Sequence, residues 1–110
     1  MTGKRPVARD DLARRLRNHL APRPGVREVR MFGGLSFMVD NRLAMSAAGD
    51  GSLLVHIDPA SYEELLRQGA EPAMMGNNRP MGRSWVAVPQ ARIESDEELA
   101  WWIAAGVQPA

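Results

Sequence analysis

Apolar and polar residues alternate along most of the stretch from residue 35 to residue 57, and this alternation predicts a sheet. A period of two places every second side chain on the same face of a strand. The apolar positions that share one parity between successive turns are Leu35, Phe37, Val39, Leu43, Met45, Leu53, Val55 and Ile57. We therefore predict an antiparallel meander of three strands with one buried face, joined by turns at 40–41 and 49–51.

Apolar residues at helical spacing predict three helices, which come before, between and after the predicted strands. Their ranges are 8–20, 59–69 and 96–106. Asp58 is placed to cap the second helix, and Ser95 with Glu98 forms a capping box for the third. Two shorter strands, near residues 72–75 and 84–88, complete the order α-β-β-β-α-β-β-α, which is an α+β fold with a mostly antiparallel sheet of five strands.

The composition is that of one globular domain. The chain has 110 residues, of which 45% are hydrophobic and 25% are charged. We expect a single domain over residues 1–110 with an ordered core over about 8–107. The chain has no cysteine, which excludes disulfides and thiolate chemistry. It also has no signal-peptide pattern and no run of about 18 apolar residues, so we expect a cytoplasmic protein with no membrane association.

Charge is distributed unevenly along the chain. In the first 30 residues, nine Lys and Arg residues stand against three acids, whereas the remainder holds five Arg and ten acids. Such an asymmetry can mark a surface that faces nucleic acid, but abundant arginine is also typical of a GC-rich genome. The arginines that could contact a partner or nucleic acid are Arg9, Arg14, Arg15, Arg17, Arg23, Arg27 and Arg30.

Two adjacent glycines, Gly33 and Gly34, precede the first strand of the meander, where a phosphate-binding loop is one interpretation. Such a loop needs spaced glycines followed by Lys and Ser or Thr before a helix, so that backbone N–H groups face the anion. Here the glycines lead into a predicted strand instead. We therefore favour a structural role, in which they allow a bulge, a bend or positive φ where the chain enters the sheet.

Ionisable and nucleophilic side chains form no catalytic or metal-binding pattern in the sequence. His19 and His56 have no second histidine or carboxylate at metal-ligand spacing, and the six serines lie in no nucleophile motif. The acidic pairs at 63–64 and 97–98 lie on predicted helices, where neighbouring side chains point about 100° apart. We therefore expect no catalytic residue, no bound metal, no cofactor and no enzymatic activity.

The aromatic and sulfur-containing side chains indicate packing and protein contact. Trp85 and Trp102 are expected in the core, whereas Trp101 falls off the apolar stripe of its helix and is a contact candidate. His56 has the opposite parity to Val55, which places it on the second face of the sheet. Adaptable packing or a plastic partner surface is favoured over copper binding for the six internal methionines, Met31, Met38, Met45, Met74, Met75 and Met81.

The stretches RMFGGLSFMVDNRLAM, LLVHIDP and RPMGRSWVAV together resemble the N-terminal domain of the TfoX/Sxy family of bacterial competence regulators. The resemblance covers about residues 8–107. One departure is Asp40-Asn41, where the family has Asp-Gly, and asparagine also accepts left-handed conformations. The motif residues that carry the resemblance are Arg30, Met31, Phe32, Gly33, Gly34, Pro80, Met81 and Trp85.

The resemblance implies a fold and a class of function. It implies a two-layer α-β(3)-α-β(2)-α fold, similar to that of secretion chaperones, and it matches the order of elements predicted above. It also implies regulation rather than chemistry, and it supplies no catalytic or ligand residue. Full-length regulators of the family carry a second, C-terminal domain, and this chain is expected to consist of the N-terminal domain alone.

Three hypotheses about function follow from the sequence. The first is a regulatory protein that acts through protein–protein contacts in transcriptional regulation, with its partner unknown and with assembly as a homodimer. The second is a nucleic-acid-binding protein that uses the Arg-rich first third, whose binding we expect to be weak and salt-sensitive. The third is a small-molecule-binding domain with a pocket near Gly33, Gly34 and the loop at 76–84.

Overall fold

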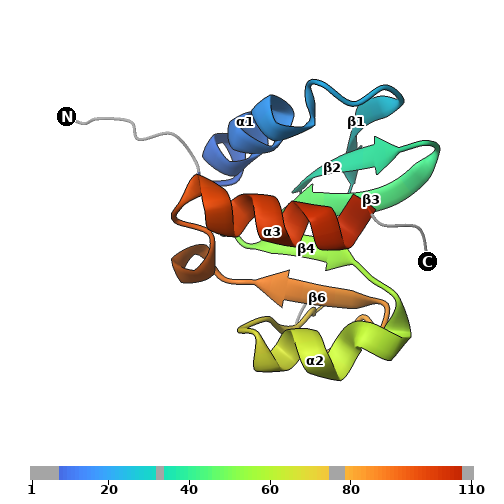
Figure 1. The fold of residues 1–110 in the computed structure, drawn as a ribbon, viewed down its shortest axis with the longest axis vertical. Helices are drawn as coiled ribbons and strands as arrows, with labels where there is room; N and C mark the ends of the chain where they lie inside the picture. The colour runs from blue at the N-terminus through green and yellow to red at the C-terminus, as the bar shows by residue number, and fades with distance from the viewer. Residues whose placement is uncertain (1–7, 32–33, 75–78, 108–110) are drawn as a thin grey trace.

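The computed structural model describes residues 8–31, 34–74 and 79–107 (Figure 1). Within these ranges the order of elements is α1 (Ala8–Leu20), β1 (Val26–Met31), β2 (Gly34–Val39), β3 (Arg42–Ala47), β4 (Leu53–His56), η1 (Pro59–Ser61), α2 (Tyr62–Arg67), β5 (Glu71–Pro72), β6 (Trp85–Val88), η2 (Gln90–Arg92) and α3 (Asp96–Val107), where η denotes a short 3-10 helix. The predicted α+β class is therefore confirmed.

One antiparallel sheet joins all six strands in the order β1-β2-β3-β4-β6-β5. The prediction had five strands, and the strand that it lacked is β1. Three of the six residues of β1 are charged, as is usual for a strand at the edge of a sheet. This composition hid the strand in the sequence.

Helices α1 and α3 cover one face of the sheet, and the core lies between these two layers (Figure 1). The buried side chains of this face include Phe37, Met45 and Val55, all fully enclosed. Helix α3 approaches the sheet closely at Gly106, where an added Cβ would lie 3.0 Å from the carbonyl oxygen of Ala44. Burial of this apolar surface is the main stabilising contribution to the fold.

Helix α2 lies beside β6, at the end of the sheet that carries β5 (Figure 1). Its buried residue Leu65 belongs to the same core cluster as the side chains beneath α1 and α3. Arg83 reaches this helix from the segment before β6, since its guanidinium lies 4.8 Å from the ring centroid of Tyr62 and 3.5 Å from Glu63. The three helices therefore share one core.

A β-bulge in β3 changes the face on which one predicted core residue lies. Phe37 pairs with Met45 but Met38 pairs with Leu43, so that Ala44 is the extra residue on β3. The extra residue reverses the parity of the positions before it. The prediction that Leu43 shares the buried face of Met45 was therefore wrong, because Leu43 lies on the second face and is half-buried.

The predicted hairpin turn and the capping box of α3 are confirmed, whereas Asp58 caps η1 and not α2, which begins at Tyr62. Asp40 and Asn41 have φ of 54° and 66°, the left-handed pair that a two-residue hairpin turn needs. The carboxylate of Asp58 accepts a hydrogen bond from the backbone N–H of Ala60 at 3.0 Å. The hydroxyl of Ser95 accepts a hydrogen bond from the N–H of Glu98 at 3.0 Å, and the carboxylate of Glu98 accepts one from the N–H of Ser95 at 3.1 Å.

Candidate protein-contact surface

The second face of the sheet, opposite α1 and α3, carries one row of side chains that crosses all six strands. Paired positions place the members of this row side by side, and they are Val29, Ser36, Ser46, Leu54, Ala87 and Glu71. Met38 and Leu43 form a neighbouring pair on the same face. None of the apolar side chains on this face belongs to the core cluster or to the half-buried residues packed against it. The apolar side chains of the second face therefore lie outside the core.

The apolar members of this face are partly exposed, whereas its two serines are buried. Val29, Met38, Leu43 and Leu54 are all half-buried. The hydroxyl of Ser36 donates a hydrogen bond to the hydroxyl of Ser46 at 3.1 Å, and that of Ser46 donates to the carbonyl of Leu35 at 3.4 Å. The serines satisfy each other, as buried polar groups must. The face thus offers apolar side chains around a polar pair that is not free to bind a ligand.

His56 and Trp85 stack on each other on this second face. Their ring centroids are 4.9 Å apart with an interplanar angle of 27°, and their positions pair across β4 and β6. The predicted position of His56 is therefore confirmed. The prediction of Trp85 as a core residue was wrong, because its parity on β6 places it on the second face, where it is half-buried. Nδ1 of His56 is buried with no hydrogen-bond partner among the described residues.

Four of the predicted contact arginines are held in ion pairs rather than directed at a common surface. Arg9 pairs with Asp10, and Arg14 with Asp11. Arg15 lies 3.5 Å from Asp96 and also donates to the carbonyls of Glu94 and Ser95, which ties α1 to the start of α3. Arg17 forms a bidentate pair with Glu28 of β1. These pairings neutralise much of the charge that the sequence concentrates in its first third.

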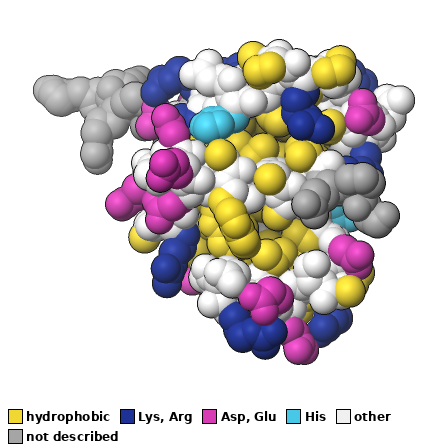
Figure 2. All heavy atoms as spheres, viewed as in Figure 1, with side chains coloured by type: hydrophobic (Ala, Val, Ile, Leu, Met, Phe, Trp, Pro, Cys, Tyr) yellow, Lys and Arg dark blue, Asp and Glu magenta, His cyan; other side chains and the backbone are white. Residues whose placement is uncertain are grey.

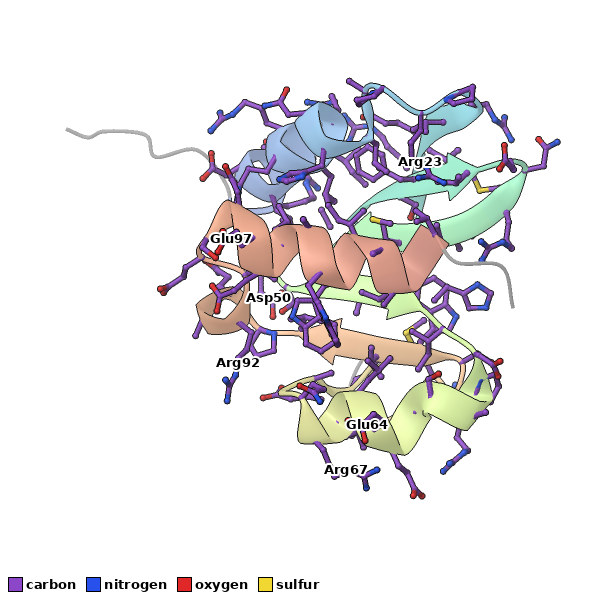
Figure 3. The ribbon with its side chains drawn as sticks, in the orientation of Figure 1. Arg23, Asp50, Glu64, Arg67, Arg92 and Glu97 are labelled. Atoms are coloured by element: carbon purple, nitrogen blue, oxygen red, sulfur yellow. The ribbon has the colours of Figure 1, made fainter. Side chains whose placement is uncertain are left out.

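The other three predicted contact arginines have no side-chain partner among the described residues, and they lie at one end of the sheet. The side chains of Arg23, Arg27 and Arg30 are exposed and form no ion pair or hydrogen bond with the residues that the structure describes. Arg23 lies in the turn before β1 (Figure 3), and the other two lie on opposite faces of β1. The unpaired predicted contact arginines therefore lie on or beside this edge strand.

The shifted pKa values follow from local hydrogen bonds. The bond from Arg17 to Glu28 raises the pKa of the Arg17 guanidinium. The backbone N–H of Ser95 lowers the pKa of Glu98, and Ser52 lowers the pKa of Asp50. Each donor stabilises the charged carboxylate of a cap or turn. These groups are structural, because each is held by the hydrogen bonds of an ion pair, a turn or a helix cap.

The family motif at 30–34 lies where β1 turns into β2. Met31 ends β1 opposite Gly34, which begins β2, while Phe32 and Gly33 lie outside the described residues. A Cβ at position 34 would lie 2.4 Å from the carbonyl oxygen of Ala47, so the chain needs a glycine there. The glycine leads into a strand, as predicted. A glycine is required there because β2 approaches Ala47 so closely, and not because the backbone has a positive φ.

The second motif segment pairs with the chain after β5. Pro80 forms an isolated bridge with Met74, and the N–H of Met81 donates to the carbonyl of Ala73 at 2.8 Å. Met74 is 48% exposed at this bridge. The pocket predicted near Gly33, Gly34 and 76–84 falls partly on residues outside the described ranges, so it stays a prediction.

Trp101 is exposed on the helix-bearing side of the molecule, as predicted. It is 49% exposed, whereas Trp102 is buried in the core, and the two rings meet edge to face at 4.7 Å. A hollow of about 350 Å³ beside them is also lined by Arg92 and Glu97 (Figure 3). Figure 2 shows hydrophobic side chains over the middle of this side, with charged ones around them. Trp101 therefore remains a contact candidate on the helix layer.

The candidate ionisable side chains lie apart from one another in the part of the chain that the structure describes. The described residues contain no cluster of three His, Cys, Asp or Glu side chains that could hold a metal ion. The carboxylates of Glu63 and Glu97, each one member of a predicted acidic pair, are exposed. His19 lies 3.8 Å from Asp96, at the junction of α1 and α3. Among the same residues, no helix has the length and apolar character needed to cross a membrane.

The fold and these surfaces define a small two-layer α+β domain, with helices on one face of an antiparallel sheet and apolar side chains on the other. The family model of the TfoX N-terminal domain matches residues 18–110, nearly the whole chain, and the chain therefore belongs to that family. The resemblance found in the sequence is confirmed. No curated protein matches the chain.

Proposed function

We propose that this protein is a non-enzymatic, cytoplasmic regulatory protein that acts through protein–protein contacts in transcriptional regulation. The observation that carries this proposal is the second face of the sheet, with its half-buried side chains Val29, Met38, Leu43 and Leu54 outside the core. Membership of the TfoX N-terminal domain family supports it, since the sequence resemblance implies competence regulators. The proposal therefore assigns the apolar face to partner binding.

The apolar face has the character of a contact surface rather than of an incomplete core. Contiguous apolar side chains on a soluble domain mark sites of association, because water leaves them when a partner binds. The two buried hydroxyls of this face, those of Ser36 and Ser46, are already hydrogen-bonded. Binding there costs no unpaired hydroxyl group, which favours a complementary apolar partner.

Substitution of Leu54 by arginine tests this surface. Leu54 lies in the centre of the row on the second face, between Ser46 and Ala87. We expect Leu54→Arg to abolish both the capture of protein partners from the native cell and the restoration of transcript levels in a deletion strain. A buried charge without a partner opposes binding strongly, by a factor of about 10 or more. Capture followed by mass spectrometry and RNA sequencing measure the two effects.

The matched control is Ala104→Arg, which adds the same charge at an exposed apolar position on α3. This variant should behave as the wild type in both assays. Circular dichroism should show that both variants keep the native fold. If Leu54→Arg retains partners and transcript levels, the second face is not the contact surface, and loss with Ala104→Arg alone would direct attention to the helix layer beside Trp101.

We also propose that the protein is a homodimer at micromolar concentration. An antiparallel sheet with half-buried apolar side chains on the face opposite its helices and a six-residue strand at its edge is the kind of element through which identical chains associate. Light scattering on the purified chain measures the mass directly. A monomer throughout the micromolar range would contradict this assembly, while leaving heterologous protein contact to the test above.

The three unpaired arginines favour nucleic-acid binding as a second candidate function, but of a weak and general kind. Arg23, Arg27 and Arg30 can neutralise phosphates, whereas the arginines of α1 are already paired with acids. We expect DNA affinity at low salt to fall steeply as salt approaches physiological concentration, because the contacts are electrostatic. Fluorescence anisotropy in a salt titration measures this.

A sequence-specific DNA binder would behave differently in the same titration. It would hold one sequence in preference to others by a factor of about 10³ or more near physiological salt. The control variant is Arg67→Glu, which should leave the DNA affinity unchanged at each salt concentration. Arg67 lies on α2 and pairs with Glu64, away from the unpaired arginines (Figure 3). Tight and selective binding by the wild type would rank nucleic-acid recognition above protein contact.

A further inference from the structure

The two edges of the sheet differ in their capacity to accept another strand. At one edge, β5 has only two residues, and one of them is Pro72. At the other edge, β1 has six residues, contains no proline and pairs with β2 without a bulge. Short edge strands with proline resist further pairing, whereas a long regular one does not. The edge at β1 is therefore the open one.

The hydrogen-bond pattern determines which residues of β1 face outward. The N–H of Asp40 donates to the carbonyl of Gly25 at 3.0 Å, which makes these residues a hydrogen-bonded pair. Such pairs alternate along an antiparallel ladder, so Arg27 and Val29 also direct their backbone groups toward β2. The N–H and C=O groups of Val26, Glu28 and Arg30 consequently point away from the sheet.

Access to this edge is not blocked by the helix layer that the structure describes. Helix α1 packs on β2 and β3, and it reaches β1 through the ion pair of Arg17 with Glu28. Arg30 lies on the same, helix-bearing face of β1 as Glu28, because the two residues are two positions apart on the strand. Arg30 has no partner among the described residues, so its charge can meet an acid on another chain.

The sequence of β1 is self-complementary in one antiparallel register. Two copies can hydrogen-bond only when outward residues oppose outward residues, which requires the two-fold axis to pass through a residue and not between two residues. The candidate centres nearest the middle of β1 are Arg27, Glu28 and Val29. A centre at Arg27 opposes Arg27 to itself, and a centre at Glu28 opposes Glu28 to itself. A centre at Val29 opposes Glu28 of each copy to Arg30 of the other, and like charges are then avoided.

We propose that two copies of this chain join through antiparallel pairing of their β1 strands about Val29, so that the two six-stranded sheets become one. This interface deepens the homodimer of the proposed function and rests on it. Two Glu28–Arg30 pairs form between the copies on the helix-bearing face, and the two Val29 side chains meet on the second face. The dimer thereby doubles the apolar face and keeps it continuous across the two-fold axis.

Reciprocal charge substitutions test this register on the full chain. Glu28→Arg opposes arginine to Arg30 twice, and Arg30→Glu opposes glutamate to Glu28 twice. We expect each variant alone to dimerise at least about 10-fold more weakly than the wild type. An equimolar mixture of the two variants, in which each acid again faces an arginine, should recover the dimer. Sedimentation velocity measures the masses, and the double variant should also dimerise.

The recovery of the dimer on mixing distinguishes an interface effect from misfolding, because misfolded chains would not complement each other. Arg23→Glu is the matched control, since it makes the same charge change at an exposed position beside β1 but off the strand. It should dimerise as the wild type does. A wild-type dimer that both single variants preserve would overturn this interface and leave the homodimer standing, whereas a monomeric wild type would overturn both.

Discussion

Replacement of Phe37 by alanine is expected to lower the free energy of unfolding by about 3–5 kcal/mol. Phe37 is fully buried on β2, on the face that α1 and α3 cover. It pairs with Met45, which is also fully buried, so the surrounding side chains are held by the sheet and cannot easily fill the space. The cost combines lost apolar burial with a cavity, and chemical denaturation measures it.

Met38→Ala is the matched comparison, because it changes a large apolar side chain at the next position of the same strand. Met38 lies on the second face and is half-buried. Its replacement should cost less than about 2 kcal/mol, since less apolar surface returns to water. Equal costs at the two positions would mean that the assignment of the two faces is wrong.

The helices could be predicted closely because residues near each end in the sequence determine where the helix begins and ends. Asp58 caps η1, which begins at the predicted start of the second helix, and the Ser95–Glu98 box caps α3, both through contacts within four positions of the chain. The first helix matches its predicted range of 8–20. Its apolar stripe marks where the helix begins, and the Pro-rich turn that follows marks where it ends. Short-range chemistry of this kind survives folding with little change.

The features that the sequence did not reveal depend on contacts between distant segments. The bulge at Ala44 reverses the parity of Leu43, and nothing in the alternation of β3 marks the extra residue. The pairing of Arg15 with Asp96 joins residues that are 81 positions apart. Arginine content alone therefore suggested a basic patch, whereas the folded chain places acids beside most of the arginines of α1.

The edge strand β1, which forms the proposed interface, could not be predicted from the sequence because of its charged composition. Glu28 and Arg30 stand at positions of the helix-bearing face, where an interior strand would have apolar residues. The apolar residues of β1, Val26, Val29 and Met31, do not all share one parity, so no period of two marks the strand in the sequence. Pairing with β2 provides the context that the sequence lacked.

Replacement of Gly34 by alanine is the second large effect that we expect, with a loss of about 1–3 kcal/mol in the free energy of unfolding. An added Cβ would lie 2.4 Å from the carbonyl oxygen of Ala47 and 3.2 Å from the hydroxyl of Ser46. The first of these atoms is backbone of β3, so the strands themselves must separate to accept the methyl group. Thermal and chemical denaturation measure the loss.

Gly49→Ala is the matched control, because an added Cβ there would have no atom within 4 Å and the residue has no positive φ. This variant should be neutral or stabilised by up to about 1 kcal/mol, since alanine restricts the unfolded chain. The comparison decides what the family motif does. If Gly34→Ala unfolds the protein more easily while Gly49→Ala does not, the motif glycine is required by the approach of β2 to β3. If Gly34→Ala keeps full stability and loses only partner binding, the motif is a contact site instead, and its position beside the β1 edge would then belong to the interface.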